Sequence, residues 1–139
     1  MQTFPDTQQS VRVEFPVVLI VDNSKVGWQR VSNLIEGVCL PGQIRAATSA
    51  RDALRKVKKL SPEIVIMDID IPAREGLGLM KTIRVTYPFI HVVVLTSESS
   101  SYYRERCSAE GVDLFFDKAT EAHHIPEVIR CLLHETTNN

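Results

Sequence analysis

The sequence has little that would suit a membrane, an oxidising compartment or a polyanionic partner. Its longest apolar run, residues 15–21, is far too short to span a bilayer, and the first ten residues lack the basic start and apolar core of a secretory signal. The three cysteines form no CxxC spacing, so we expect free thiols in a reducing cytoplasm. A net charge of -1 gives no bulk attraction to nucleic acid or to anionic lipid. We therefore expect a cytoplasmic protein that binds neither of them directly.

The composition is that of one folded domain. The chain has 139 residues, of which 44% are hydrophobic and 24% are charged, so it can bury one core but not two. It contains no internal repeat, no low-complexity stretch and no linker. We predict an N-terminal tail over residues 1–14 and a single domain over residues 15–139.

Short apolar runs alternate with longer segments of helical period. Continuous β-branched runs such as VVLIV and VVVL are typical of parallel strands that are buried on both faces. Ser49 is placed to cap one of the helices. The predicted strands are 17–21, 44–47, 64–67, 91–97 and 113–118, and the helical stripes lie within 31–38, 51–60, 77–83, 102–111 and 125–133. Five such units predict a doubly wound α/β fold, although these patterns leave the strand order open.

Polar side chains follow four of the predicted strands. Asp22, Asp68 and Lys118 come at the ends of the first, third and fifth strands, and Thr96 and Ser97 end the fourth. Because ligands of open α/β sheets bind at the carboxyl ends of the strands, we expect these side chains to converge. Carboxylates bind Mg²⁺, and a hydroxyl and an ammonium can each bind a phosphoryl oxygen. Either aspartate alone would indicate a cap or a turn, whereas the whole set favours phosphoryl transfer to an aspartate.

The segment DIDIP at residues 68–72, with Gly76 after it, resembles the D-x-x-[MI]-P…G signature of the receiver domain of two-component response regulators. The runs VLIVDN, VVVLTS and FFDK match further motifs of that family in the expected order, and the likeness covers about residues 15–134. The resemblance implies a flavodoxin-like, five-stranded parallel sheet of order 2-1-3-4-5 with helices on both faces. It also implies a stand-alone signalling domain similar to the chemotaxis regulators.

The resemblance assigns the acceptor and the metal ligands. Asp68 corresponds to the aspartate that accepts a phosphoryl group from a histidine kinase or a phosphotransfer protein. Mg²⁺ would be held by Asp22, by Asp68 and by the backbone carbonyl of Asp70. Asn23 replaces the second carboxylate of the family's acidic pair, so we expect it to contribute weakly or indirectly.

The resemblance also assigns the groups that sense the phosphoryl group. Thr96 and Lys118 correspond to residues that contact it, and Thr96 and Phe115 correspond to the pair that changes position on activation. The expected output is altered binding to a downstream protein that the sequence does not name. Ala119 stands where many receivers have a proline after the lysine, so we expect no cis peptide there.

Two other functions stay open at this point. The same fold without the second carboxylate suits a pseudo-receiver, an interaction module that works without phosphorylation. The DID segment also fits a haloacid dehalogenase-type phosphatase, with Asp68 as nucleophile and Asp70 as general acid. A single stoichiometric phosphorylation, without turnover, would favour the receiver, and steady hydrolysis of a phosphomonoester would favour the phosphatase.

Overall fold

Five parallel strands form one sheet in the order β2-β1-β3-β4-β5. The computed structural model describes residues 16–68, 73–97 and 101–138. This order is the one implied by the likeness to receiver domains, and each predicted strand is present to within two residues at either end. The strands are β1 (Val18–Val21), β2 (Ile44–Ala47), β3 (Ile64–Met67), β4 (His91–Thr96) and β5 (Leu114–Asp117).

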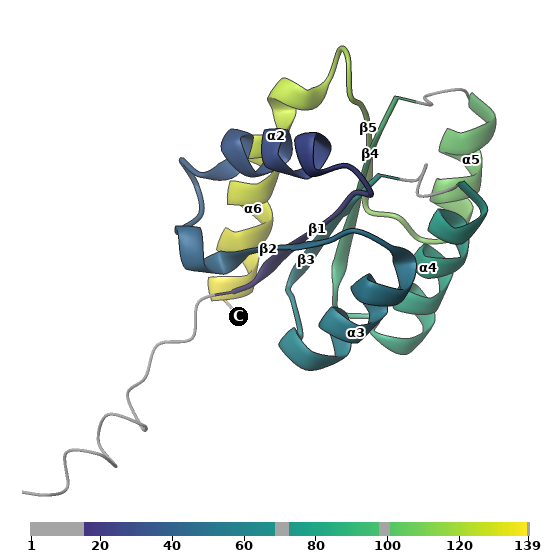
Figure 1. The fold of residues 1–139 in the computed structure, drawn as a ribbon, viewed down its shortest axis with the longest axis horizontal. Helices are drawn as coiled ribbons and strands as arrows, with labels where there is room; N and C mark the ends of the chain where they lie inside the picture. The colour runs from purple at the N-terminus through teal and green to yellow at the C-terminus, as the bar shows by residue number, and fades with distance from the viewer. Residues whose placement is uncertain (1–15, 69–72, 98–100, 139) are drawn as a thin grey trace, which may run out of the picture.

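Helices cover both faces of the sheet. Figure 1 shows α2 and α6 on one face and α3, α4 and α5 on the other. The helices are α2 (Lys25–Ile35), α3 (Ala50–Leu60), α4 (Ala73–Thr86), α5 (Ser101–Ala109) and α6 (Ile125–Asn138). Two 3₁₀ segments, Pro41–Gln43 and Ala122–His124, precede β2 and α6 and were not expected from the periodicity. None of the helices in the described part of the chain has the length and apolar character needed to cross a membrane.

The central strands are buried on both faces, which explains why their sequences are continuously apolar. Leu19 and Val21 point into a core shared with α3, α4 and α5, whereas Val18 and Ile20 point into a core shared with α2 and α6. All four side chains are essentially inaccessible to solvent. The two cores pack the sheet between its helices, and because all the strands are parallel the carboxyl ends of β1, β3, β4 and β5 meet at one edge.

Serine side chains fix where two helices begin. Ser49 Oγ accepts a hydrogen bond from Asp52 N at 3.0 Å, which confirms the predicted cap of α3. Ser24 caps α2 in the same way, with its Oγ 3.1 Å from Gly27 N. Helix α3 ends at Ser61, whose φ of 48° lies in the left-handed region that stops a helix.

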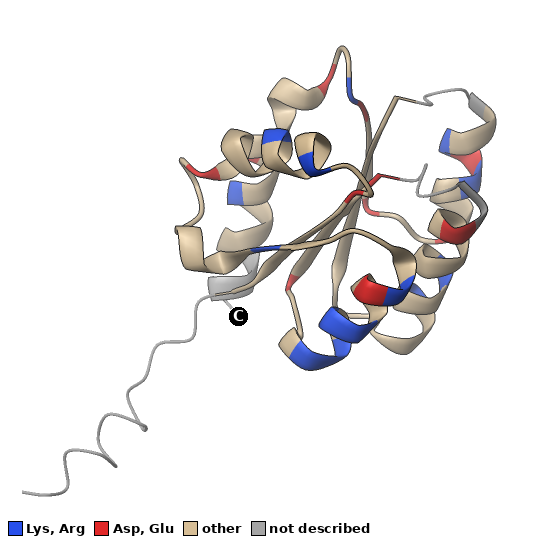
Figure 2. Ribbon diagram, viewed as in Figure 1, with Lys and Arg blue, Asp and Glu red and all other residues tan. Residues whose placement is uncertain are grey.

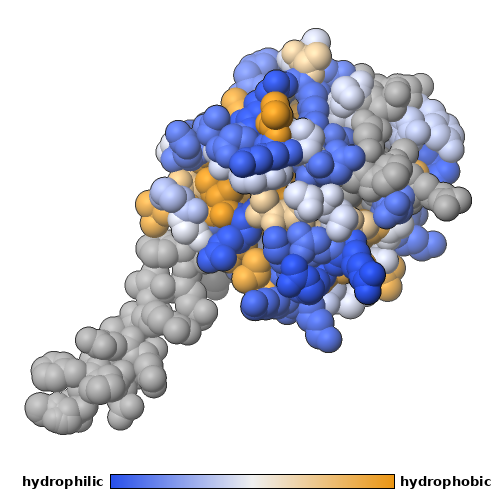
Figure 3. Space-filling view, viewed as in Figure 1, coloured by the Kyte–Doolittle hydropathy of each residue, from blue (hydrophilic) through white to orange (hydrophobic). Residues whose placement is uncertain are grey.

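Helix α3 carries a strongly basic outer surface (Figure 2). Residues 45–59 contain six of the 16 basic side chains of the chain and only one acidic side chain, Asp52. The charges lie on the solvent side, and this face of the molecule is largely hydrophilic, with hydrophobic residues in small separate patches (Figure 3). Lys56 also has an inward role, because its ammonium donates to the carbonyl oxygen of Ala46 on β2.

Candidate functional site

One ammonium group joins two carboxylates at the carboxyl edge of the sheet. Asp22 and Asp68 directly follow β1 and β3, and Lys118 directly follows β5. Lys118 Nζ lies 2.7 Å from Asp68 Oδ2 and 3.1 Å from Asp22 Oδ2. The chain separations are large, but the three strands end at the same edge, as the sequence predicted. The structure therefore brings together Asp22, Asp68 and Lys118.

The cluster is shielded from water, so its charges interact strongly. The side chains of Asp22 and Asp68 are 4% and 12% exposed, and that of Lys118 is 25% exposed. Burial acts to lower the pKa of Lys118, but hydrogen bonds and charge from Asp68 and Asp22 outweigh it and hold the pKa above its ordinary value. Lys118 is therefore a full positive charge at neutral pH, directed at Asp68.

The position of Asp22 depends on a glycine that the sequence analysis missed. Asp22 Oδ1 accepts a hydrogen bond from Ser24 N at 2.9 Å, which turns the carboxylate toward the start of α2. A Cβ atom at Gly27 would lie only 2.3 Å from Asp22 Oδ2. No side chain fits there unless the carboxylate moves. The available signal was a glycine in the first turns of an otherwise regular helix, where glycine costs helix stability.

The carboxylates of Asp22 and Asp68 are the kind of ligand that Mg²⁺ takes, usually one or two of them together with waters and phosphate oxygens. Both contact the Lys118 ammonium through Oδ2, so they lie at the same edge of the sheet. Asn23 is exposed beside Asp22. Among the residues that the structure describes, no group of three or more His, Cys, Asp or Glu side chains comes together as a metal site. Asp70, a predicted carbonyl ligand, lies outside the described residues.

Thr96 is fully buried at the end of β4. Its carbonyl oxygen accepts a hydrogen bond from Lys118 N at 2.8 Å, so the backbones of two predicted site residues are tied together across β4 and β5. Phe115 lies half-buried on β5, and its ring packs against the core beneath α3, α4 and α5. The roles of Thr96 and Phe115 as a switch pair stay a prediction.

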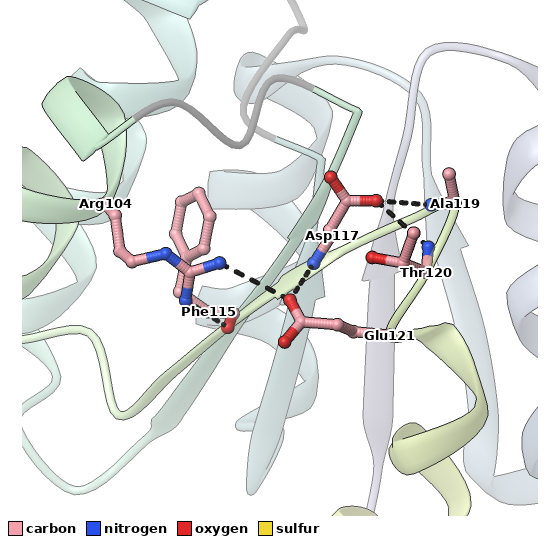
Figure 4. Close-up of polar contacts among 6 residues, drawn as sticks. All are labelled: Arg104, Phe115, Asp117, Ala119, Thr120 and Glu121. Carbon is pink, nitrogen blue, oxygen red and sulfur yellow. Dashed lines mark hydrogen bonds and ion pairs between the residues drawn. The ribbon is translucent and has the colours of Figure 1, made fainter.

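Arg104 lies against Phe115, and Glu121 lies against the loop that carries Lys118 (Figure 4). No sequence pattern pointed to either residue. The guanidinium carbon of Arg104 lies 4.6 Å from the centroid of the Phe115 ring, and Arg104 Nη2 lies 3.4 Å from Glu121 Oε1. The same Oε1 accepts a hydrogen bond from Asp117 N at 2.8 Å. Nothing in the local sequence pairs residues on α5 with the loop after β5, because the contact exists only once the two elements pack.

This geometry defines the class of the protein: a flavodoxin-like domain with a carboxylate–lysine cluster at the carboxyl ends of its strands. The family model described as the response regulator receiver domain matches residues 18–130. The chain therefore belongs to the response regulator receiver domain family.

Curated relatives support the same family. The chain is 31% identical over 124 residues to the response regulator protein VraR of Staphylococcus saprophyticus, which covers 88% of the chain and 56% of the relative. It is 32% identical over 108 residues to a protein-glutamate methylesterase/protein-glutamine glutaminase of Methanosarcina acetivorans, which covers 76% of the chain and 30% of the relative. The chain thus spans about a third to just over half the length of these relatives.

Solved structures agree with the fold. A CheY-like receiver domain protein of Methanospirillum hungatei superposes with a TM-score of 0.79 at 20% identity, over 90% of this chain and 98% of that one. The chemotaxis protein CheY4 of Vibrio cholerae superposes with a TM-score of 0.74 at 24% identity, over 86% of this chain and 99% of that one. At these identities the likeness shows the fold alone.

Proposed function

We propose that this receiver domain accepts a phosphoryl group on Asp68 from a histidine kinase or a phosphotransfer protein, in a reaction that requires Mg²⁺. One observation carries the proposal: Lys118 Nζ lies 2.7 Å from Asp68 and 3.1 Å from Asp22. This arrangement places a positive charge where a phosphoryl group on Asp68 would bring several negative oxygens. Membership of the family supports the donor class.

In this proposal an oxygen of Asp68 attacks phosphorus and forms the new P–O bond. The bond from phosphorus to the donor breaks, and the leaving nitrogen keeps the electron pair and takes a proton from solvent. Lys118 neutralises the phosphoryl oxygens as the bond forms. Mg²⁺, when bound, would be held by Asp22 and Asp68 and the carbonyl of Asp70, with Asn23 at its side, and would supply further neutralisation of charge.

The proposed output is a changed protein-binding surface. The side chains of Thr96 and Phe115 would respond to the phosphoryl group, and Phe115 lies next to α5 through its contact with Arg104. The domain would then signal to a downstream protein. The family match sets aside the phosphatase alternative, since Asp68 ends the third strand and β1, with Asp22 after it, precedes it.

The test is incubation with Mg²⁺ and acetyl phosphate, followed by intact-mass measurement. We expect the wild-type chain to gain one phosphoryl group. Asp68→Asn should gain none, because an amide of nearly the same shape cannot attack phosphorus. Asp52→Asn, a matched change on α3 away from the site, should behave as wild type.

Two outcomes would contradict the proposal. Phosphate incorporation into a folded Asp68→Asn protein would place the acceptor elsewhere. No incorporation into the folded wild-type protein, at millimolar Mg²⁺ and with several phosphodonors, would support the pseudo-receiver alternative that Asn23 suggests.

A further inference from the structure

The loop that carries Lys118 is held by side chains of its own. Asp117 Oδ1 accepts hydrogen bonds from Ala119 N at 2.8 Å and from Thr120 N at 3.0 Å, and Glu121 N donates to Asp117 O at 2.8 Å. Many receivers have a proline at the position of Ala119, and a proline has no N–H to donate. The described residues contain no cis peptide. In this chain the Asp117 carboxylate therefore holds the turn after β5, which the N–H of Ala119 makes possible.

Glu121 closes this turn from the other side. Its carboxylate reaches back to Asp117 N, the amide that immediately precedes Lys118, and the same Oε1 pairs with Arg104 on α5 (Figure 4). The N–H of Asp117 and the guanidinium of Arg104 hold the pKa of Glu121 below its ordinary value, so the carboxylate is charged at neutral pH. A single oxygen thus links the Lys118 loop to a different helix.

Arg104 makes the link to Phe115. Its Nη1 donates to the carbonyl oxygen of Phe115 at 3.2 Å, and its guanidinium covers the ring of Phe115. Phe115 and Asp117 lie on β5 just before Lys118, and Glu121 lies just after it. Arg104 pairs with the same Glu121 oxygen that binds Asp117 N. A movement of Phe115 away from Arg104 would therefore disturb Arg104, and through it the contact between Glu121 and Asp117 N.

We propose that Glu121 is a positioning residue for Lys118, and that its pairing with Arg104 ties the position of the Lys118 ammonium to helix α5. Lys118 N bonds to Thr96 O and its Nζ reaches Asp68 and Asp22, so the direction of the side chain follows the conformation of this loop. This inference rests on the proposed function in one respect only: the role of Lys118 in phosphoryl transfer is taken from it.

Three variants separate the two contacts of Glu121. Glu121→Gln keeps an oxygen for Asp117 N but removes the charge that attracts Arg104, and Glu121→Ala removes both. Arg104→Gln removes the charge from the other side. Glu127→Ala is the matched control, because Glu127 lies in an exposed ion pair with Arg130 on α6.

Two readouts are taken by NMR on the protein without phosphodonor: hydrogen exchange of the Asp117 amide, and the chemical shifts of Cε and Nζ of Lys118. We expect Glu121→Ala to speed exchange at Asp117 by about tenfold or more and to shift the Lys118 signals. Glu121→Gln should restore most of the protection at Asp117. Glu121→Gln and Arg104→Gln should shift the Lys118 signals alike, and Glu127→Ala should change nothing.

The third readout is the rate of phosphorylation by acetyl phosphate, which we expect to fall in Glu121→Ala. Unchanged exchange at Asp117, or unchanged Lys118 signals, in Glu121→Ala would overturn the inference, whatever the rate. Exchange at Asp117 and the Lys118 signals could both change while neither the wild type nor any variant takes up phosphate. In that case the positioning role stands and the proposed function fails.

Discussion

Asn23 is the residue at which this chain departs most clearly from the family pattern. It is exposed and directly follows Asp22, so a carboxylate at this position would add a negative charge close to Asp22. A unit charge a few ångströms from Mg²⁺ contributes roughly 4 kcal/mol of gross Coulomb energy at an effective dielectric near 20, most of which desolvation and repulsion among carboxylates remove. We therefore expect Asn23→Asp to tighten Mg²⁺ binding by about tenfold. Calorimetric titration, or the fluorescence of the half-buried Trp28 on α2, measures this.

The control is Asn33→Asp, which adds the same charge on the exposed surface of α2 and should leave Mg²⁺ affinity near the wild-type value. Asn23→Asp should also speed phosphorylation of Asp68 at low Mg²⁺ and lower the free energy of unfolding of the metal-free protein. Equal affinities in wild type and Asn23→Asp would mean that another group already supplies the missing charge.

At the scale of elements, helix α2 begins so close to Asp22 that a Cβ atom at position 27 would collide with its carboxylate. An alanine in a helix interior usually adds about 0.5–1 kcal/mol of stability over glycine. At Gly27 the added Cβ would displace the Asp22 carboxylate, from which it would be 2.3 Å away. We therefore expect Gly27→Ala to show none of this added stability, to bind Mg²⁺ more weakly and to be phosphorylated more slowly. Urea unfolding and Mg²⁺ titration measure the two effects.

Gly78→Ala on α4 is the matched change, because a Cβ there would meet no atom within 4 Å. This variant should become more stable and keep wild-type Mg²⁺ affinity and phosphorylation. Gly27→Ala could instead gain as much stability as Gly78→Ala and keep its Mg²⁺ affinity. That result would show that the Asp22 carboxylate can move without loss of stability or of metal binding.

Most of these elements could be predicted because their signals are local. The strands β1, β3 and β4 are continuous apolar runs, and Ser49 marks the start of α3 within its own turn. The meeting of Asp22, Asp68 and Lys118 could also be predicted, since parallel strands bring their carboxyl ends to one edge. The contact between Arg104 and Glu121 could not, because it depends on how α5 packs against β5, and neither residue lies in a recognisable pattern.

At the scale of the whole molecule, stability should depend on acidic pH through carboxylates whose pKa values folding lowers. The pKa of Glu121 lies below its ordinary 4.5 because of Asp117 N and Arg104. Burial acts to raise the pKa of Asp52, but hydrogen bonds from Arg55 and Lys56 outweigh it and hold the pKa below the ordinary 3.8. Groups of this kind contribute stability that is present above their unfolded pKa and lost as pH falls through their folded pKa.

We therefore expect the free energy of unfolding to be nearly constant between pH 7 and pH 5 and to fall below about pH 4.5. Urea midpoints at a series of pH values measure it. The fall should be smaller in Glu121→Gln and in Asp52→Asn than in wild type. Lys118, with its raised pKa, contributes stability that is fully present below pH 10.5 and is lost as pH rises through its higher folded value. Identical acid profiles in the wild type and both variants would contradict this account.

The hydrogen bond from Lys56 to Ala46 bears on whether copies of the chain can associate through the edge of the sheet. Strand β2 is an edge of the sheet, and the carbonyl of Ala47 already accepts from Asp22 N on the β1 side. The carbonyl of Ala46 therefore points outward, where an extended segment of another copy could pair with it. The ammonium of Lys56 occupies that carbonyl, and exposed Arg45 adds a second charge to the same strand. The sheet is thereby closed to growth by strand addition at β2, which favours a domain that stays unaggregated when concentrated.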